Sequence, residues 1–213
     1  MLKFFNAQRL ILIGTAFFVL LLFVGFSYLV HKDVFTQFDF NMTVRLQDHI
    51  SRRFDGFFSL FSAIGSFEPM TLLLIILLLF RRKLWGILTF GLFGSMHLVE
   101  IFGKSFVSHL PPPEFLLRTQ QLVNFPQFYV RLQNSYPSGH MGRAFFLTVF
   151  LGVWAGSSKK LSQTQKVFVY ACLIMYDSIM LISRIYLGEH WTSDVIGGTL
   201  LGTSMGLLGA VFL

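Results

Sequence analysis

The feature that most restricts the possible folds of this chain is a stretch of twenty residues, 11–30, without a charged side chain. A helix needs about 20 apolar residues to cross the hydrocarbon core of a bilayer. Five further, predominantly apolar stretches follow at residues 57–80, 84–103, 141–156, 167–183 and 195–213. We therefore expect an all-α, polytopic membrane protein with six transmembrane helices, in which residues 1–213 form a single membrane-embedded domain.

The composition agrees with this class and excludes several others. Charged residues make up 13% of the chain, whereas about a quarter of the residues of a soluble domain are charged. The net charge of +7 is not gathered into a basic stripe interleaved with aromatic residues, so no nucleic-acid partner is expected. Membrane orientation and contact with anionic lipids explain this charge more simply. The single cysteine, Cys172, excludes an intrachain disulfide and a thiolate metal site.

The polar links between the expected helices predict the orientation of the chain in the membrane. Six spans place both termini on the same side. The links at residues 81–83 and 157–166 contain six basic residues and no acidic one. Because basic residues are enriched in cytoplasmic links, both termini are expected in the cytoplasm. The small size of the chain favours a bacterial inner (plasma) membrane.

Polar or charged residues stand at one end of each of four spans. Because successive helices cross the membrane in opposite directions, these four ends are expected to lie on the same side. Lys104 ends the third span, residues 137–140 begin the fourth, Arg184 ends the fifth, and His190 and Asp194 begin the sixth. With cytoplasmic termini, all four places lie on the extracytoplasmic face. We therefore expect one site at the outer membrane–water interface.

The residue types in these clusters match what cleavage of a phosphate ester requires, namely cationic groups, a nucleophile in line and a proton donor. Ser138 and Gly139 open a helix, whose free N–H groups and dipole favour an anion. Two histidines, His140 and His190, are able to divide the roles of nucleophile and acid. Asp194 lies one helical turn beyond His190, where it can fix the histidine tautomer and stabilise an imidazolium.

These motifs resemble those of the type-2 phosphatidic-acid phosphatase superfamily of integral-membrane lipid phosphatases. The second motif of that family, Pro-Ser-Gly-His, stands at residues 137–140. The third, Ser-Arg-x5-His-x3-Asp, is complete as Ser183, Arg184, His190 and Asp194. The resemblance covers residues 104–194 by motif, and it implies a helical core of that family's kind.

The first motif of the family, Lys-x6-Arg-Pro, is present only in part. Lys104 is followed at the expected distance by Pro111 and Pro112, so that a proline stands in place of the arginine. Arg118, Arg131 and Arg143 are candidates to replace that arginine in space. We select Arg118, because it follows the proline cluster.

The resemblance implies a metal-independent hydrolase that uses no cofactor and forms a phosphohistidine. His190 would attack phosphorus with the support of Asp194, and His140 would protonate the leaving group and later activate water. The groups that would bind the phosphate are Lys104, Ser138, Gly139 and Arg184, with Arg118 as the added candidate. The sequence contains no carboxylate-rich cluster that would argue for a metal ion.

The substrates implied by the family are lipid phosphates or diphosphates, with undecaprenyl diphosphate, phosphatidylglycerol phosphate, phosphatidate and lipid A phosphates as the candidates. The lipid tail would stay among the membrane lipids while the head group reaches the polar site. Two alternatives stay open. One is a phosphotransferase of the same family, and the other is a non-catalytic binder or transporter of lipid phosphates, which the missing arginine makes conceivable.

Two patterns outside the motifs predict packing and pairing. Gly198, Gly202 and Gly206 recur at every fourth position, which predicts close helix packing within the monomer rather than a dimer interface. Glu100 stands one turn before Lys104, so we expect the two side chains to form an ion pair.

Three further features give local expectations. Residues 31–53 are mixed in charge and carry spaced phenylalanines, which favours an interfacial amphipathic segment. Glu68 and Pro69 fall inside the second apolar stretch, where they suggest a broken helix. His109 is expected to be an ordinary interface residue.

Overall fold

The computed structural model of the chain describes residues 7–81, 85–120 and 133–213. These ranges hold α-helices and two short 3-10 helices, and they contain no strand. The α-helices are α1 (Ala7–His31), α2 (Thr36–His49), α3 (Asp55–Ile64), α4 (Phe67–Arg81), α5 (Gly86–Phe106), α6 (Gly139–Ser157), α7 (Gln163–Tyr186) and α8 (Thr192–Ala210). The 3-10 helices are η1 (Arg52–Phe54) and η2 (Glu114–Leu116). The prediction of an all-α chain is confirmed for the described residues.

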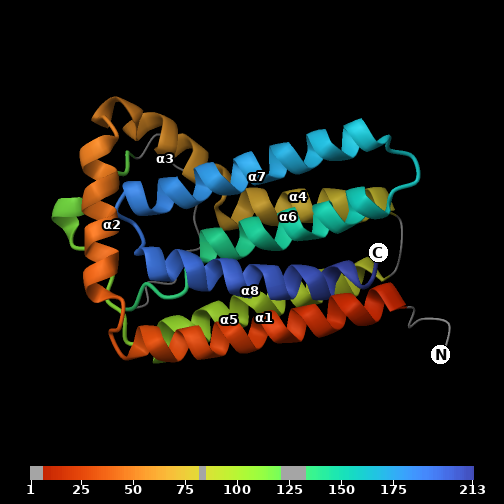
Figure 1. Ribbon diagram of the computed structural model, residues 1–213, viewed down its shortest axis with the longest axis horizontal. Helices are drawn as coiled ribbons and strands as arrows, with labels where there is room; N and C mark the ends of the chain where they lie inside the picture. Colours follow the sequence, from red (N-terminus) through yellow and green to blue (C-terminus); the bar gives the residue numbers. More distant parts are fainter. Residues whose placement is uncertain (1–6, 82–84, 121–132) are drawn as a thin grey trace.

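The long helices run side by side as one bundle, and α2 crosses its end (Figure 1). Helix α8 is central, since it packs against α1, α5 and α6 and is buried along most of its length. Polar side chains hold some of these contacts. Ser204 of α8 donates to the carbonyl of Ala16 in α1, and Thr89 of α5 donates to the carbonyl of Gly209.

Three helices of the described chain, α1, α5 and α7, are long and apolar enough to cross a membrane. Helices α3 and α4 meet this criterion as a pair, with a bend of 47° between them. Thus three or four of the six expected spans have the length and hydropathy of a membrane helix. Helices α6 and α8 are less apolar because they lie inside the bundle, where small and polar residues contact other helices.

The bend between α3 and α4 lies close to the position that the sequence predicts. Helix α3 ends at Ile64 and α4 begins at Phe67, so Glu68 and Pro69 occupy the first turn of α4. A proline is tolerated in a first turn, because its missing N–H has no intrahelical partner there. The expected broken helix is therefore confirmed.

Helix α2 occupies the region for which the sequence predicts an amphipathic segment. Phe38 and Phe40 are exposed on its outer side, whereas Asp39 and Gln47 are buried against the bundle. Gln47 donates to the carbonyls of Leu116 and Tyr186, at 2.7 and 2.9 Å, and so fixes α2 to the end of α7. Polar side chains of α2 thus face the bundle, while Phe38 and Phe40 face outward among polar residues such as Asn41 and Arg45.

The contact between α6 and α8 depends on the glycines of α8. A Cβ atom added at Gly198 would overlap the carbonyl oxygen of Ser138, the N-cap residue of α6. A Cβ atom added at Gly202 would overlap the carbonyl oxygen of Gly142 in α6. A Cβ at Gly206 would press on Phe146 in the same way. These residues therefore let two helix backbones approach closely within one chain, which confirms the packing predicted from their spacing.

We expect Gly202→Ala to destabilise the protein by about 1–3 kcal/mol, because the added methyl group meets backbone rather than a flexible side chain. The measurement is the melting temperature of the protein in detergent. Gly94→Ala in α5 is the matched control, since a Cβ there meets no other described atom within 4 Å. Equal melting temperatures for the two variants would contradict this account of the packing.

Candidate active site

The clusters singled out in the sequence come together at the end of the bundle that α2 crosses (Figure 1). Helix α6 begins there at Gly139, and α7 ends there near Arg184. The turn that follows α7 requires Gly188, whose φ is +69°, a conformation that glycine adopts without strain. This turn leads through His190 into α8, and the N–H of Ser138 donates to the carbonyl of Asp194 at 3.0 Å.

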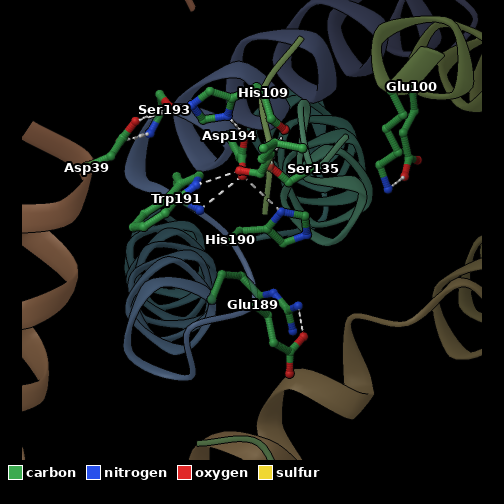
Figure 2. Close-up of polar contacts among 12 residues, drawn as sticks. Asp39, Glu100, His109, Ser135, Glu189, His190, Trp191, Ser193 and Asp194 are labelled. Atoms are coloured by element: carbon green, nitrogen blue, oxygen red, sulfur yellow. Dashed lines mark hydrogen bonds and ion pairs between the residues drawn. The ribbon is translucent and has the colours of Figure 1, made fainter. Parts of the chain in front are cut away.

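His190 is held by the carboxylate of Asp194, as the sequence predicts. The two side chains are buried, and His190 Nδ1 lies 3.3 Å from Asp194 Oδ2. The same oxygen accepts the backbone N–H of Trp191 at 3.0 Å, in the manner of a capping box at the start of α8. Because a carboxylate only accepts, Nδ1 carries the proton and Nε2 keeps its lone pair. Figure 2 shows these contacts.

The environment keeps His190 uncharged at neutral pH. Burial, together with the positive charges of Arg184 and Lys104, lowers the pKa of His190 to about 4, against the opposing effect of Asp194. A neutral imidazole with a free Nε2 is the form that a nucleophile requires. The contact with Asp194 agrees with the pairing expected from the sequence, and the role of His190 as the nucleophile stays a prediction.

His140 lies in the first turn of α6 and is partly exposed. Four side chains act on it electrostatically, and they come from four parts of the chain: Arg184, Arg143, His190 and Lys104. The structure thus places both histidines in one electrostatic environment with the cations. An acid or base at this position can serve the same reacting group as His190.

Arg184 and Ser138, two of the predicted phosphate ligands, differ in their surroundings. Arg184 is buried and is held by Ser62 of α3 and by the carboxylate of Glu189. Ser138 is 1% exposed, and its Oγ has no hydrogen-bond partner among the described residues. An unpaired buried hydroxyl is costly in isolation, and a bound anion would satisfy it. Gly139 follows directly, at the positive end of the α6 dipole.

Lys104 forms the predicted ion pair with Glu100, and the pair belongs to a larger cluster. The Glu100 carboxylate lies 3.0 Å from Lys104 Nζ, 3.1 Å from His97 Nδ1 and 3.6 Å from Arg143 Nη1. A Cβ atom at Gly139 would overlap this carboxylate. Glu100 therefore occupies the space in front of Gly139 and neutralises cations that would otherwise face each other unpaired.

The candidates for the missing arginine differ in their surroundings. Arg118 stacks over the ring of Tyr186 at 5.1 Å and donates from Nη1 to the carbonyl of Ile50 at 3.4 Å. Arg143 is buried, donates from Nε to the carbonyl of Gly65 at 3.1 Å and acts on His140. Arg131 lies outside the described residues. The role of Arg118 stays a prediction, and the structure places Arg143, another of the three candidates, where its charge acts on His140.

Two residues of this site were missed by the sequence reasoning. His109 is buried, and its Nδ1 lies 2.9 Å from Asp194 Oδ1, so its prediction as an ordinary interface residue was wrong. Asp39 of α2 faces the other side of the same ring, with Oδ2 3.6 Å from His109 Nε2. Neither residue belongs to a recognisable motif. The described residues contain no group of three or more His, Cys, Asp or Glu arranged to hold a metal ion.

The larger, C-terminal part of the chain matches a known protein family. The model of the PAP2 superfamily matches residues 84–213. Phosphatidylglycerophosphatase B of Bacillus subtilis (strain 168) is 30% identical over 124 residues, which are 58% of this chain and 56% of that protein. The aligned region thus spans little more than half of the length of that relative.

Two crystal structures share the fold. The transmembrane PAP2-type phosphatidylglycerolphosphate phosphatase of Bacillus subtilis superposes with a TM-score of 0.70 at 21% identity, over 91% of this chain and 93% of that one. Aquifex aeolicus LpxE superposes with a TM-score of 0.60 at 25% identity, over 81% and 94% of the two chains. The described chain has three helices long and apolar enough to cross a membrane and shares the fold of a transmembrane protein, which together identify it as an integral membrane protein.

The buried ion pair of His109 predicts how stability depends on pH. Burial alone would lower the pKa of His109, but the two carboxylates more than offset it and raise the pKa to about 9. An ordinary histidine has a pKa of about 6.5. The stability that this pair contributes is therefore complete below about pH 6.5 and is lost as the pH rises through about 9.

We expect the melting temperature of the protein in detergent to fall between pH 6.5 and 9 more steeply than that of His109→Gln. His49→Gln is the control, because His49 is exposed at the end of α2 and bonds only to the carbonyl of Arg45 among the described residues. Parallel curves for wild type and His109→Gln would show that His109 carries no charge in the folded protein.

Proposed function

This chain belongs to the PAP2 superfamily, and from that premise we propose that it is an integral-membrane phosphatase that hydrolyses a lipid phosphomonoester or diphosphate. We propose further that residues 1–213 form one domain with six transmembrane helices, cytoplasmic termini and a site on the extracytoplasmic face of a bacterial inner membrane. The reaction would proceed through a phosphohistidine and require no metal ion.

One observation carries this proposal: the contact between the buried carboxylate of Asp194 and Nδ1 of His190. It leaves Nε2 of a neutral imidazole available for attack, beside Arg184 and the first turn of α6. A protein that only binds a lipid phosphate needs cations and N–H donors. It does not need a histidine whose tautomer is fixed by a buried carboxylate, which is the arrangement of an activated nucleophile.

In the first step, His190 Nε2 would attack the phosphorus atom while the bond from phosphorus to the leaving oxygen breaks. His140, in its protonated form, would transfer its proton to that oxygen, so that a neutral alcohol or a monophosphate leaves. The His190 ring then carries a positive charge, which the Asp194 carboxylate stabilises through Nδ1–H. The cationic groups would hold the phosphoryl oxygens throughout, namely Lys104, Arg184 and Arg143, with Ser138 Oγ and the N–H of Gly139 as donors.

In the second step, water would replace the histidine on phosphorus. His140, now neutral, takes a proton from the water molecule as its oxygen attacks. The bond between phosphorus and His190 Nε2 breaks, and inorganic phosphate leaves. His190 is then neutral again and His140 is protonated, so the site returns to its starting state. A second lipid in place of water would make the enzyme a phosphotransferase, which analysis of the products would reveal.

The position of the site suits an amphiphilic substrate. It lies at one end of the helix bundle, so a lipid tail would remain beside the helices while the phosphate reaches the polar residues (Figure 1). The similarity to phosphatidylglycerophosphatase B makes phosphatidylglycerol phosphate the first substrate to test. Undecaprenyl diphosphate, phosphatidate and lipid A phosphates are the other members of the panel.

We expect the purified protein to release phosphate from one of these lipids in detergent with a chelator present. His190→Ala should lower the rate by at least about 10³-fold, because it removes the nucleophile. His49→Ala, at an exposed histidine of α2, is the control and should retain full activity. With ³²P-labelled substrate, acid-labile label should accumulate on His140→Ala and be absent from His190→Ala. Tight binding of all four lipids without release would favour the non-catalytic binder.

A further inference from the structure

Asp194 is shared between two histidines, and only one of them belongs to a motif. Its Oδ2 accepts from His190, while its Oδ1 accepts from His109 Nδ1 at 2.9 Å. The far side of the His109 ring faces Asp39 of α2, with Nε2 3.6 Å from Oδ2. Figure 2 shows Asp39, His109, Asp194 and His190 following one another across the site.

The side chains of Asp39, His109, Asp194 and His190 are all shielded from solvent. Asp194 is fully buried, and Asp39 and His109 are 2% and 8% exposed. Two carboxylates in such surroundings are costly unless a cation lies between them. The His109 imidazolium is placed to be that cation, since each of its two N–H groups faces one carboxylate.

The backbone around His109 fixes its position before any substrate binds. Its N–H donates to Asn134 Oδ1 at 3.1 Å, and its carbonyl accepts from both the N–H and the Oγ of Ser135. Asn134 in turn donates to the carbonyl of Lys104 at 3.0 Å. The segment that carries His109 is therefore tied to the end of α5 and to the residues that lead into α6.

Asp39 contributes in a second way, because it caps helix α8 from outside. Its two oxygens accept the backbone N–H of Ser193 at 2.8 Å and the Oγ of the same residue at 2.6 Å. The N–H groups of a first helical turn have no partner within the helix, so a carboxylate there stabilises the helix start. Asp194 is the next residue, and its orientation thus depends on α2.

We infer that His109 and Asp39 are positioning residues for the nucleophile, which hold the Asp194 carboxylate ionised and in one orientation so that His190 keeps its Nδ1–H tautomer. This inference rests on the proposed function for its kinetic consequence, but the tautomer of His190 is independent of catalysis. Without His109, Oδ1 of Asp194 loses the single side-chain donor recorded for it among the described residues. The carboxylate is then free to rotate or to take up a proton, and His190 loses its fixed acceptor.

One test does not depend on enzyme activity: ¹⁵N NMR of the protein labelled at histidine. The His190 signals are assigned by their absence from the spectrum of His190→Asn. We expect one tautomer, protonated at Nδ1, in the wild type, and a mixture of tautomers in His109→Gln. An unchanged His190 spectrum in folded His109→Gln would overturn the inference, whatever the enzyme assay shows.

The kinetic test uses phosphatidylglycerol phosphate in mixed micelles, or the lipid of the panel that the wild type prefers. For His109→Gln and Asp39→Asn we expect kcat to fall about 10–100-fold, with KM changed less than about twofold, because the nucleophile is misaligned while the phosphate ligands remain. In the variant that combines His109→Gln with Asp39→Asn, the fold-loss of kcat should be smaller than the product of the two separate fold-losses, since both residues act through Asp194. Full kcat in both variants would overturn the inference, whereas an inactive wild type would count against the proposed function alone.

Chemical rescue separates positioning from a general loss of structure. His109→Gly leaves a space the size of the ring, and added imidazole should raise its kcat at least about fivefold by restoring the cation beside Asp194. His49→Gly, at an exposed histidine, is the matched control and should not respond. A folded His109→Gly protein with low kcat that imidazole fails to raise would indicate a purely structural role and contradict the inference.

Discussion

The close approach of helices α6 and α8 is the contact on which the rest of the site depends. A side chain at Gly198 or Gly202 would collide with the carbonyl of Ser138 or Gly142, so only glycine lets the two backbones meet there. The same contact brings the N–H of Ser138 to the carbonyl of Asp194 at 3.0 Å. The start of α6, with Ser138 and His140, is thereby fixed beside the start of α8, with Asp194. Two motifs about fifty residues apart become one site because α8 carries glycine where it meets the backbone of α6.

Electrostatics divides this site into two parts. On one side, Glu100 contacts Lys104, His97 and Arg143 in front of Gly139, and under the proposed function a phosphate would meet Lys104 and Arg143. On the other side, His109 lies between Asp39 and Asp194. His190 stands between the two parts, neutral and with Nδ1 on Asp194. Within the described part of this site, the buried Arg143, Arg184 and Asp194 each face a group of opposite charge, which is the condition for keeping charged groups at the end of an apolar bundle.

Those features of the fold and the site that depend on residues close together in the chain can be predicted from the sequence. The apolar runs of α1, α5 and α7 are long enough to be recognised, and the spacing of His190 and Asp194 places them one turn apart. Helices α6 and α8 are harder to classify as spans, because their inward surfaces carry small and polar residues. The contact of His109 with Asp194 has no local signal at all. It joins residues 85 positions apart and depends on how α2 and the segment before α6 pack across the bundle end.

A structure of the protein with orthovanadate, which mimics the five-coordinate phosphoryl group, would show which histidine is the nucleophile. If it is His190, we expect a bond from vanadium to His190 Nε2, with Nδ1 still on Asp194 and the vanadate oxygens within hydrogen-bond distance of Arg184 and Ser138 Oγ. Vanadate bonded to His140 instead, or bound with His190 turned away from Asp194, would contradict the assignment of His190 as the nucleophile.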